Sequence, residues 1–250
     1  MRHLILTLEA PLMAFGGETV DNYGVTRWFP AASMLAGLLA NALGWRRIEH
    51  ERHQALQDRL IFAARIDRGL AEGGILRDFQ TAQLGAKDRA WTSHGRPEGR
   101  AGGARTYDAP HLRYRDYLAD MRVTVALRFE PEAESPALDN VAHALQRPAR
   151  PLFIGRKPCL PSTQLFTGFC DADSALAALR AIPVNPDPDQ PTVRVLWPDG
   201  DGSAGVSASR RHFLTDQRNW ASGLHGGGRV VCESELPCNW FGPSTGTPDA

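Results

Sequence analysis

The chain has 250 residues and a formal net charge of zero, with 28 Lys and Arg against 28 Asp and Glu. Hydrophobic residues make up 42% and charged residues 22%, proportions that are ordinary for a soluble globular protein. The opening sequence MRHLILTLEAP has only a short apolar run, which excludes a signal peptide or a membrane-spanning helix there. We therefore expect a cytoplasmic protein with no membrane partner, built as one large domain or as one domain with an insertion.

The first predicted element is a strand at residues 4–8, where LILTL alternates. A long glycine-bearing loop follows and ends at Pro30. Ser33 then fits the N-cap of a helix that runs to Gly44, because SMLAGLLANALG places its apolar side chains on one face. LIFAARI at residues 60–66 predicts a second strand.

Residues 76–122 interrupt this pattern. They are rich in glycine and arginine, with nine Lys and Arg against six Asp and Glu, and residues 94–105 have no apolar period. The regular pattern resumes with a strand at residues 123–129. A helix follows at SPALDNVAHALQR, with Ser135 as its cap, and then a strand at residues 164–170.

The order of these elements predicts the fold class α+β, because strand, helix, strand, strand, helix, strand is the ferredoxin-like order. The core would comprise residues 1–75 and 123–170, with residues 76–122 as an insertion. Residues 171–240 predict a C-terminal extension with a short helix and strands near TVRVLW and RVVCE, and residues 241–250 a disordered tail.

Two short motifs carry little chemistry. The glycines of DGDGSAG have dinucleotide-like spacing, but no helix follows, so we interpret them as a surface turn. HERH, at residues 50–53, spaces its histidines three apart and predicts a solvated face rather than a zinc site. The four cysteines form no C-x-x-C pair, so we predict free thiols, no metal site and no cofactor.

The cations point to a polyanion. RPARPLFIGRK, at residues 147–157, combines four positive charges with a glycine that lets backbone N–H groups approach a phosphate. Arg27 lies just before the helix that starts at Ser33, whose free N–H groups would also donate hydrogen bonds to an anion. The insertion adds cations and aromatic rings suited to single-stranded RNA, including Arg77, Lys87 and Arg105.

Several of these stretches also resemble, in order, one known family. LILTLEAPLMAFGG, TRWFPAASMLAGLLANALG, LRDFQTAQLGA, RYRDYLADMRVTVAL and RPLFIGRKPCLPS are similar to the Cas5 (Cas-five, CasD) family of the type I-E CRISPR Cascade. The resemblance covers roughly residues 1–170. It implies a RAMP-type ferredoxin-like, RRM-type palm with a protruding β-hairpin thumb.

The resemblance also implies a non-catalytic role. Members grip the 5′ handle of crRNA and seat the backbone and large subunits of Cascade, which reaches target DNA as a complex. Carried over by motif, and joined to the cations noted above, the expected RNA-binding residues are Arg27, Ser33, Arg77, Phe79, Gln80, Thr81, Lys87, Arg105, Arg113, Tyr114, Gly155, Arg156 and Lys157.

Two alternatives stay open. Relatives in the type I-C system resemble this fold yet cleave precursor crRNA without metal, using side chains such as Tyr, Lys and His. Tyr23, Lys87 and His94 are the right residue types for such an endoribonuclease, but they lie in no recognisable motif. A stand-alone RNA chaperone is a third class, against which the handle-like motifs argue.

Overall fold

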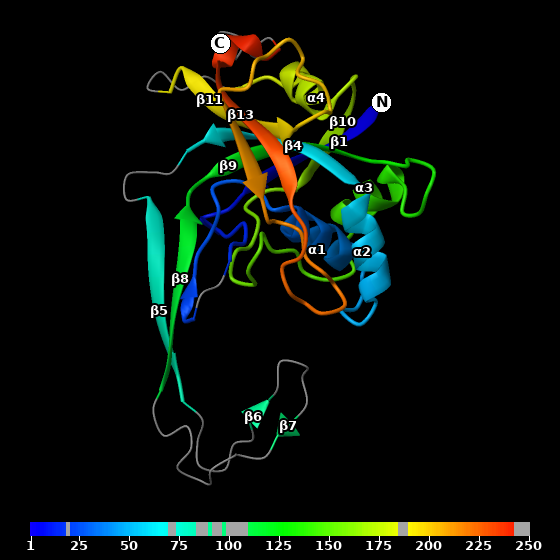
Figure 1. Cartoon of the computed structure of the whole chain (residues 1–250). Coiled ribbons are helices and arrows are strands. Elements are labelled where there is room, and N and C mark those ends of the chain that lie inside the picture. Colours follow the sequence, from blue (N-terminus) through cyan, green and yellow to red (C-terminus); the bar gives the residue numbers. More distant parts are fainter. Residues whose placement is uncertain are drawn as a thin grey trace, which may run out of the picture.

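The computed structural model describes residues 1–18, 21–69, 74–83, 90–91, 97–98, 110–184 and 190–242. Its main body is one antiparallel sheet of seven strands with helices on both faces (Figure 1). The chain is therefore α+β, as predicted. The strands of this sheet, from edge to edge, are β10 (Phe166–Asp171), β1 (Arg2–Glu9), β9 (Arg122–Phe129), β4 (Leu60–Arg68), β11 (Thr192–Pro198), β13 (Arg229–Pro237) and β12 (Arg210–Leu214).

The four strands predicted for the core lie side by side. In chain order they are β1, β4, β9 and β10. Across the sheet they lie in the order β10, β1, β9, β4, that is, the fourth strand, then the first, the third and the second. Each neighbouring pair is antiparallel. β11 joins the free side of β4, pairing Arg194 with Ile66, so residues 192–237 continue the same sheet.

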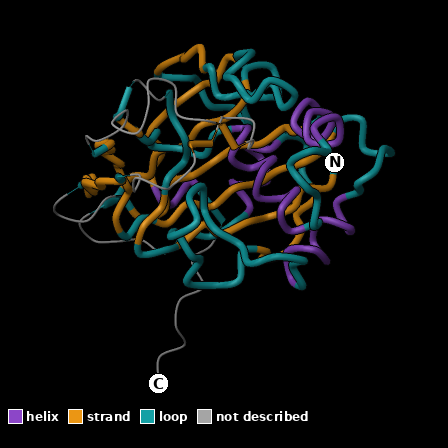
Figure 2. The backbone as a smooth tube through the Cα atoms, turned by 90° about the horizontal axis from the view of Figure 1, so that it is seen from below, coloured by secondary structure: helices purple, strands orange, loops and turns teal. Residues whose placement is uncertain are grey.

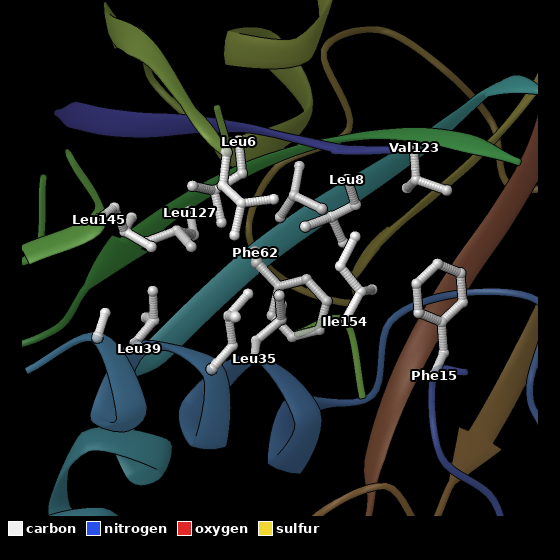
Figure 3. Close-up of a cluster of buried hydrophobic side chains, with 14 of the residues drawn as sticks. Leu6, Leu8, Phe15, Leu35, Leu39, Phe62, Val123, Leu127, Leu145 and Ile154 are labelled. Atoms are coloured by element: carbon white, nitrogen blue, oxygen red, sulfur yellow. The ribbon is translucent and has the colours of Figure 1, made fainter. Parts of the chain in front are cut away.

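One face of the sheet packs against α1 (Ala32–Ala42) and α3 (Leu138–Gln146). Figure 3 shows leucines of β1 and α1 meeting around Phe62, with Leu145 of α3 beside them. Every second residue of β1 points into this cluster, because successive side chains of a strand alternate between faces. α2 (His50–Asp58) packs outside α1, and Figure 2 shows most helical turns on the side where the N-terminus lies.

The opposite face packs against α4 (Ala175–Ala181), whose Ser174 is an N-cap that accepts a hydrogen bond from the Ala177 N–H. Because both faces are covered, β1 is buried along nearly its whole length rather than on one side. Phe241 belongs to this second cluster and the Gly242 N–H donates to the Arg180 carbonyl, so the tail predicted from residue 241 is wrong for these two residues. Residues 243–250 lie outside the described residues.

A second, smaller sheet projects from the body (Figure 1). Its central strand is β8 (His111–Ala119), which pairs with β5 (Ile75–Ala82) along its length. β8 also pairs with β2 (Leu12–Met13) at its C-terminal end and with β3 (Tyr23–Gly24) near its middle. The short strands β6 (Ala90–Trp91) and β7 (Pro97–Glu98) pair with each other in the insertion. We call the region where β3, β5 and β8 meet the thumb root.

Two local predictions need correction here, and one strand was not predicted. The helix predicted from Ser135 begins at Leu138, where the side chain of Asn140 accepts the Ala137 N–H at 3.1 Å. HERH opens α2, and its His53 is buried between Trp45 and Trp220, so the solvated-face interpretation is wrong for that residue. β12 lies where no element was predicted.

The remaining observations concern the glycine-rich turn, the cysteines, metal ligands and the helices. The glycines of DGDGSAG adopt positive φ in a turn, as predicted. No disulfide joins the four cysteines, all of which are described. Within the described residues, no group of three or more His, Cys, Asp or Glu is arranged to hold a metal ion. None of the described helices has the length and apolar composition that a bilayer crossing needs. The short 3₁₀ helix at Cys238–Trp240 closes the described fold.

Candidate nucleic-acid interface

One face of the thumb root carries a row of aromatic rings. The pairing of β3, β8 and β5 places Tyr23 beside Tyr114, and Tyr114 beside Phe79. The rings of Tyr23 and Tyr114 stack at 4.9 Å with an interplanar angle of 11°, and Phe79 lies 5.1 Å from Tyr114. Phe79 is 53% exposed and Tyr23 46% exposed, so the row is open to a planar ligand. Rings presented this way on a strand surface are suited to stacking with nucleic-acid bases.

An ion pair lies next to this row, two positions along the same pair of strands. Arg77 lies opposite Asp116 in the β5–β8 ladder, and its Nε and Nη2 donate to the two carboxylate oxygens at 2.7 and 3.1 Å. The guanidinium also lies 5.9 Å from the Tyr23 ring. The hydrogen bond from Arg77 holds the pKa of the buried Asp116 carboxyl below its usual range. Arg77 is therefore already paired, so we expect it to position the row and not to bind phosphate alone.

The other face of the thumb root is basic. Arg113 and Arg115 alternate with the aromatic residues of β8 and line a hollow of about 420 Å³ with Arg156 and Lys157. Within the described part of the chain, Arg113, Arg115 and Lys157 make no ion pair. Unneutralised cations around a hollow attract a polyanion, and their guanidinium forks match phosphate oxygens.

The glycine-bearing loop that contributes Lys157 is anchored in the core. Ile154 is fully buried and points toward Leu8 and Leu35 (Figure 3). Its carbonyl accepts the Ala14 N–H at 3.2 Å. Burial of an isoleucine of this kind stabilises the fold by about 1.5–3 kcal/mol. The loop therefore presents Lys157 from a fixed position.

The structure explains why residue 155 is a glycine in a different way from the sequence prediction. A Cβ at this position would stand 1.6 Å from the carbonyl oxygen of Ala14, and φ is +85°. The missing side chain thus permits close packing of two backbone segments inside the protein. Internal packing is therefore enough to explain the glycine at position 155, and close approach of a phosphate is not needed to explain it.

Arg156 is also engaged within the protein. Its guanidinium donates to the carbonyl oxygens of Asp116 at 2.8 Å and Gly24 at 2.7 Å, and it lies 4.9 Å from the Tyr117 ring. These contacts join the loop to β8 and β3. Arg156 therefore sets the shape of the hollow, whereas Lys157 is exposed in it.

The predicted anion site at the start of α1 is occupied by the protein itself. The buried Asp216 carboxylate accepts the Ala32 N–H at 3.1 Å, and the Asp216 carbonyl accepts the Ser33 N–H at 3.0 Å. The N-cap residue is Ala31, so the prediction of Ser33 as N-cap is wrong. Arg27 donates to the Thr215 carbonyl at 3.2 Å and pairs with Glu18. A negative charge at a helix N-terminus is stabilising, which accounts for this arrangement.

The structure thus brings most of the predicted residues to the thumb root and leaves two elsewhere. Phe79, Tyr114 and the exposed Thr81 share the aromatic face, and Gln80 and Arg113 share the basic face. Arg27 and Ser33 lie beside Asp216 instead. Lys87 and Arg105, and His94 of the cleavage alternative, lie outside the described residues.

Two members of the site were not selected from the sequence as RNA contacts. Tyr23 is expected from the sequence only in the cleavage alternative. Its place in the aromatic row depends on the parallel pairing of β3 with β8, which no local pattern predicts. Arg115 was detectable, because the resemblance implies a hairpin here and Arg115 directly follows Tyr114 in it. Asp216 gave no signal, since it lies far along the chain from the helix that it caps.

Comparison with known proteins identifies the family. A model of the family described as CRISPR-associated protein (Cas_Cas5) matches residues 3–232. The chain belongs to the Cas5 family. A curated relative, CRISPR system Cascade subunit CasD of Escherichia coli strain K12, is 32% identical over 186 residues, which are 74% of this chain and 79% of the relative.

Two solved structures share the fold of this Cas5 chain. A chain of a CRISPR RNA-guided surveillance complex matches with a TM-score of 0.67 at 24% identity, covering 97% of this chain and 95% of the other. A crystal structure of a Cas protein matches with a TM-score of 0.61 at 21% identity, covering 96% and 97%. At these identities the likeness extends to the fold alone.

Proposed function

We propose that this Cas5 chain is a non-catalytic, cytoplasmic subunit of a type I-E Cascade complex that binds the 5′ handle of crRNA at the thumb root. The family membership and the relative named as a Cascade subunit support the assembly. On this proposal the backbone and large subunits of the complex are its protein neighbours, and target DNA is reached through them.

The observation that carries the RNA assignment is the division of the thumb root into two faces. Stacked rings at Tyr23, Tyr114 and Phe79 stand on one face, and unpaired cations at Arg113 and Lys157 stand on the other. Single-stranded nucleic acid offers these two chemistries together, since its bases stack and its phosphates are charged. A duplex keeps its bases stacked on each other and would use only the cations.

The fold supports a ferredoxin-like palm for residues 1–75 and 123–170. Its four strands follow the order fourth, first, third, second, with α1 between the first and second strands and α3 between the third and fourth. In this proposal residues 76–122 form the thumb, and residues 171–240 form an extension that widens the same sheet. The thumb root lies where β8 leaves the palm, so RNA held there contacts both parts.

The test is a binding and cleavage assay on one sample. The purified chain is incubated with labelled repeat RNA and a chelator, and both the bound fraction and the RNA length are measured. We expect a complex with intact RNA, and much weaker binding to a duplex of the same sequence. A specific cut that is lost in Tyr23→Phe or His94→Ala would instead support the endoribonuclease. Failure to bind repeat RNA at all would refute the RNA assignment.

A further inference from the structure

A pair of arginines far from the thumb root has no described counter-ion. Arg47 follows α1, and Arg218 lies in the segment between β12 and β13. A Cβ added to Gly223 would stand 3.1 Å from Nη2 of Arg218 and 3.5 Å from Nη2 of Arg47. The two guanidinium groups therefore converge on the same point of the surface, where glycine leaves room between them.

The surrounding structure holds this pair in place. The Gln57 side chain of α2 donates to the Arg218 carbonyl at 3.0 Å and accepts the Arg218 N–H at 3.0 Å. Gln54 accepts the Trp220 N–H, and Trp220 packs on the buried His53. The backbone that carries Arg218 is thus fastened to α2 at several points, close to where α1 ends and Arg47 follows.

Two carboxylates close in sequence to the arginines are engaged elsewhere. Glu49 accepts hydrogen bonds from the Arg46 N–H and from Arg52, and Asp216 pairs with Arg229. Neither Arg47 nor Arg218 makes an ion pair with a described residue. Burial and the neighbouring Arg47 lower the pKa of Arg218, as expected of like charges held close together. An added anion would relieve this repulsion.

We propose that Arg47 and Arg218 bind a carboxylate of a neighbouring protein subunit, with Ile48 and Leu224 as the apolar contacts beside it. The two apolar residues adjoin the point of convergence in sequence and are 74% and 69% exposed. Arginine flanked by exposed apolar side chains is typical of protein interfaces. This inference rests on the proposed assembly into a multisubunit complex, but not on RNA binding at the thumb root.

The same surface is poorly suited to RNA. Its aromatic rings are already covered in part, because Trp45 is buried under the Arg52 guanidinium and the half-buried Trp220 packs against His53. A phosphate backbone also has no apolar group to place on Ile48 or Leu224. In Figure 1, α2 and the thumb strands β5 and β8 stand on opposite sides of the body, so this surface is separate from the proposed RNA site.

The first test compares charge-reversed complexes. The chain is co-expressed with the other Cascade proteins of its own organism, either as wild type, as Arg47→Glu with Arg218→Glu, or as the control Arg180→Glu with Arg210→Glu at exposed sites elsewhere. We expect the first double variant to retain at least tenfold less of one protein subunit than the control. Its affinity for repeat RNA should stay within twofold of wild type. Arg47→Glu alone, at an exposed position, replaces the double variant if that variant does not fold.

The outcomes separate this inference from the proposed function. Wild-type chain that assembles with none of these proteins overturns both. Assembly retained by both double variants, or lost equally in both, overturns the inference alone. Loss of RNA affinity with protein assembly intact assigns the arginine pair to nucleic acid and also overturns it.

A photo-crosslink identifies the occupant. A benzophenone side chain placed at Ile48 in the assembled complex is irradiated, and the products are digested and sequenced by mass spectrometry. We expect a cross-link to a partner peptide that contains Asp or Glu within a few residues of the attachment point. A cross-link to RNA, or none to any subunit, contradicts the proposal.

Discussion

Gly155 is the residue whose substitution tests the internal packing of the glycine-bearing loop. Two backbone segments meet there, and a methyl group would overlap the Ala14 carbonyl oxygen at 1.6 Å. Gly205 offers a matched control, since its φ of +80° is similar to the +85° of Gly155 but nothing lies within 4 Å of an added Cβ. The two positions therefore share the conformational penalty and differ in the steric one.

We expect Gly155→Ala to lower the free energy of unfolding by more than about 2 kcal/mol, the sum of backbone strain and overpacking. Gly205→Ala should cost only about 1 kcal/mol. Urea denaturation of both variants measures the difference. Equal losses would show that Ala14 does not constrain Gly155.

The Arg77–Asp116 pair predicts a pH dependence of stability. The folded-state pKa of Asp116 is lowered by Arg77, so the pair stabilises fully above the unfolded value of about 3.9 and is lost as the pH falls below it. Asp116→Asn should lower stability by about 1–2 kcal/mol at pH 7 and flatten the decline between about pH 5 and pH 2. Melting curves across this range measure it.

Asp139→Asn is the control for that series, because Asp139 pairs with Arg2 at an exposed site. It should change stability by less than about 0.5 kcal/mol. If Asp116→Asn follows the wild-type pH profile throughout, the ion pair does not contribute as described.

At the scale of elements, the aromatic row depends on three strands that meet in register. β3, β8 and β5 contribute one ring each, and the exposure of Phe79 leaves one end of the row free. Phe79 makes few buried contacts, so its ring can be removed without damage to the core. This separates its role in RNA binding from its role in folding.

Phe79→Ala should weaken binding of single-stranded repeat RNA by about 1–3 kcal/mol, the usual contribution of one base–aromatic stack. The melting temperature should stay close to wild type. Leu76→Ala, an exposed apolar change on the same strand, should leave RNA affinity unchanged. Fluorescence anisotropy with labelled RNA measures both, and equal effects of the two variants would contradict the stacking role.

The elements also show what local pattern can predict. Apolar runs located β1, β4, β9 and the buried face of α3, because each buries its apolar residues in the sheet–helix core. α2 lacked such a stripe, since HERHQALQD buries little besides His53, Leu56 and Gln57. β12, with the sequence RRHFL, is an edge strand that buries little, so it also lacks an apolar pattern by which it could be predicted.

At the scale of the whole molecule, the site was predictable in composition and only partly in geometry. The resemblance implied a hairpin from residues of β5 and β8, and these two strands do pair along their length. The internal bonds of Arg156 and the capping of α1 by Asp216 depend on contacts between residues 40 or more positions apart. No local sequence pattern reports such contacts, so the roles of Arg156 and Asp216 could be found only from the folded structure.

The central claim is that cations of the thumb-root hollow hold the phosphates of single-stranded RNA. Its most direct test is a salt titration of repeat-RNA affinity for wild type and for Arg113→Ala with Lys157→Ala, two positions without a described ion pair. Each phosphate contact contributes about 0.7 to the slope of log affinity against log salt, so the double variant should flatten it by about 1.4. Arg180→Ala with Arg210→Ala, which removes the same charge at exposed sites elsewhere, should leave the slope within about 0.3 of wild type. A double variant at the hollow with wild-type affinity and slope would contradict the claim.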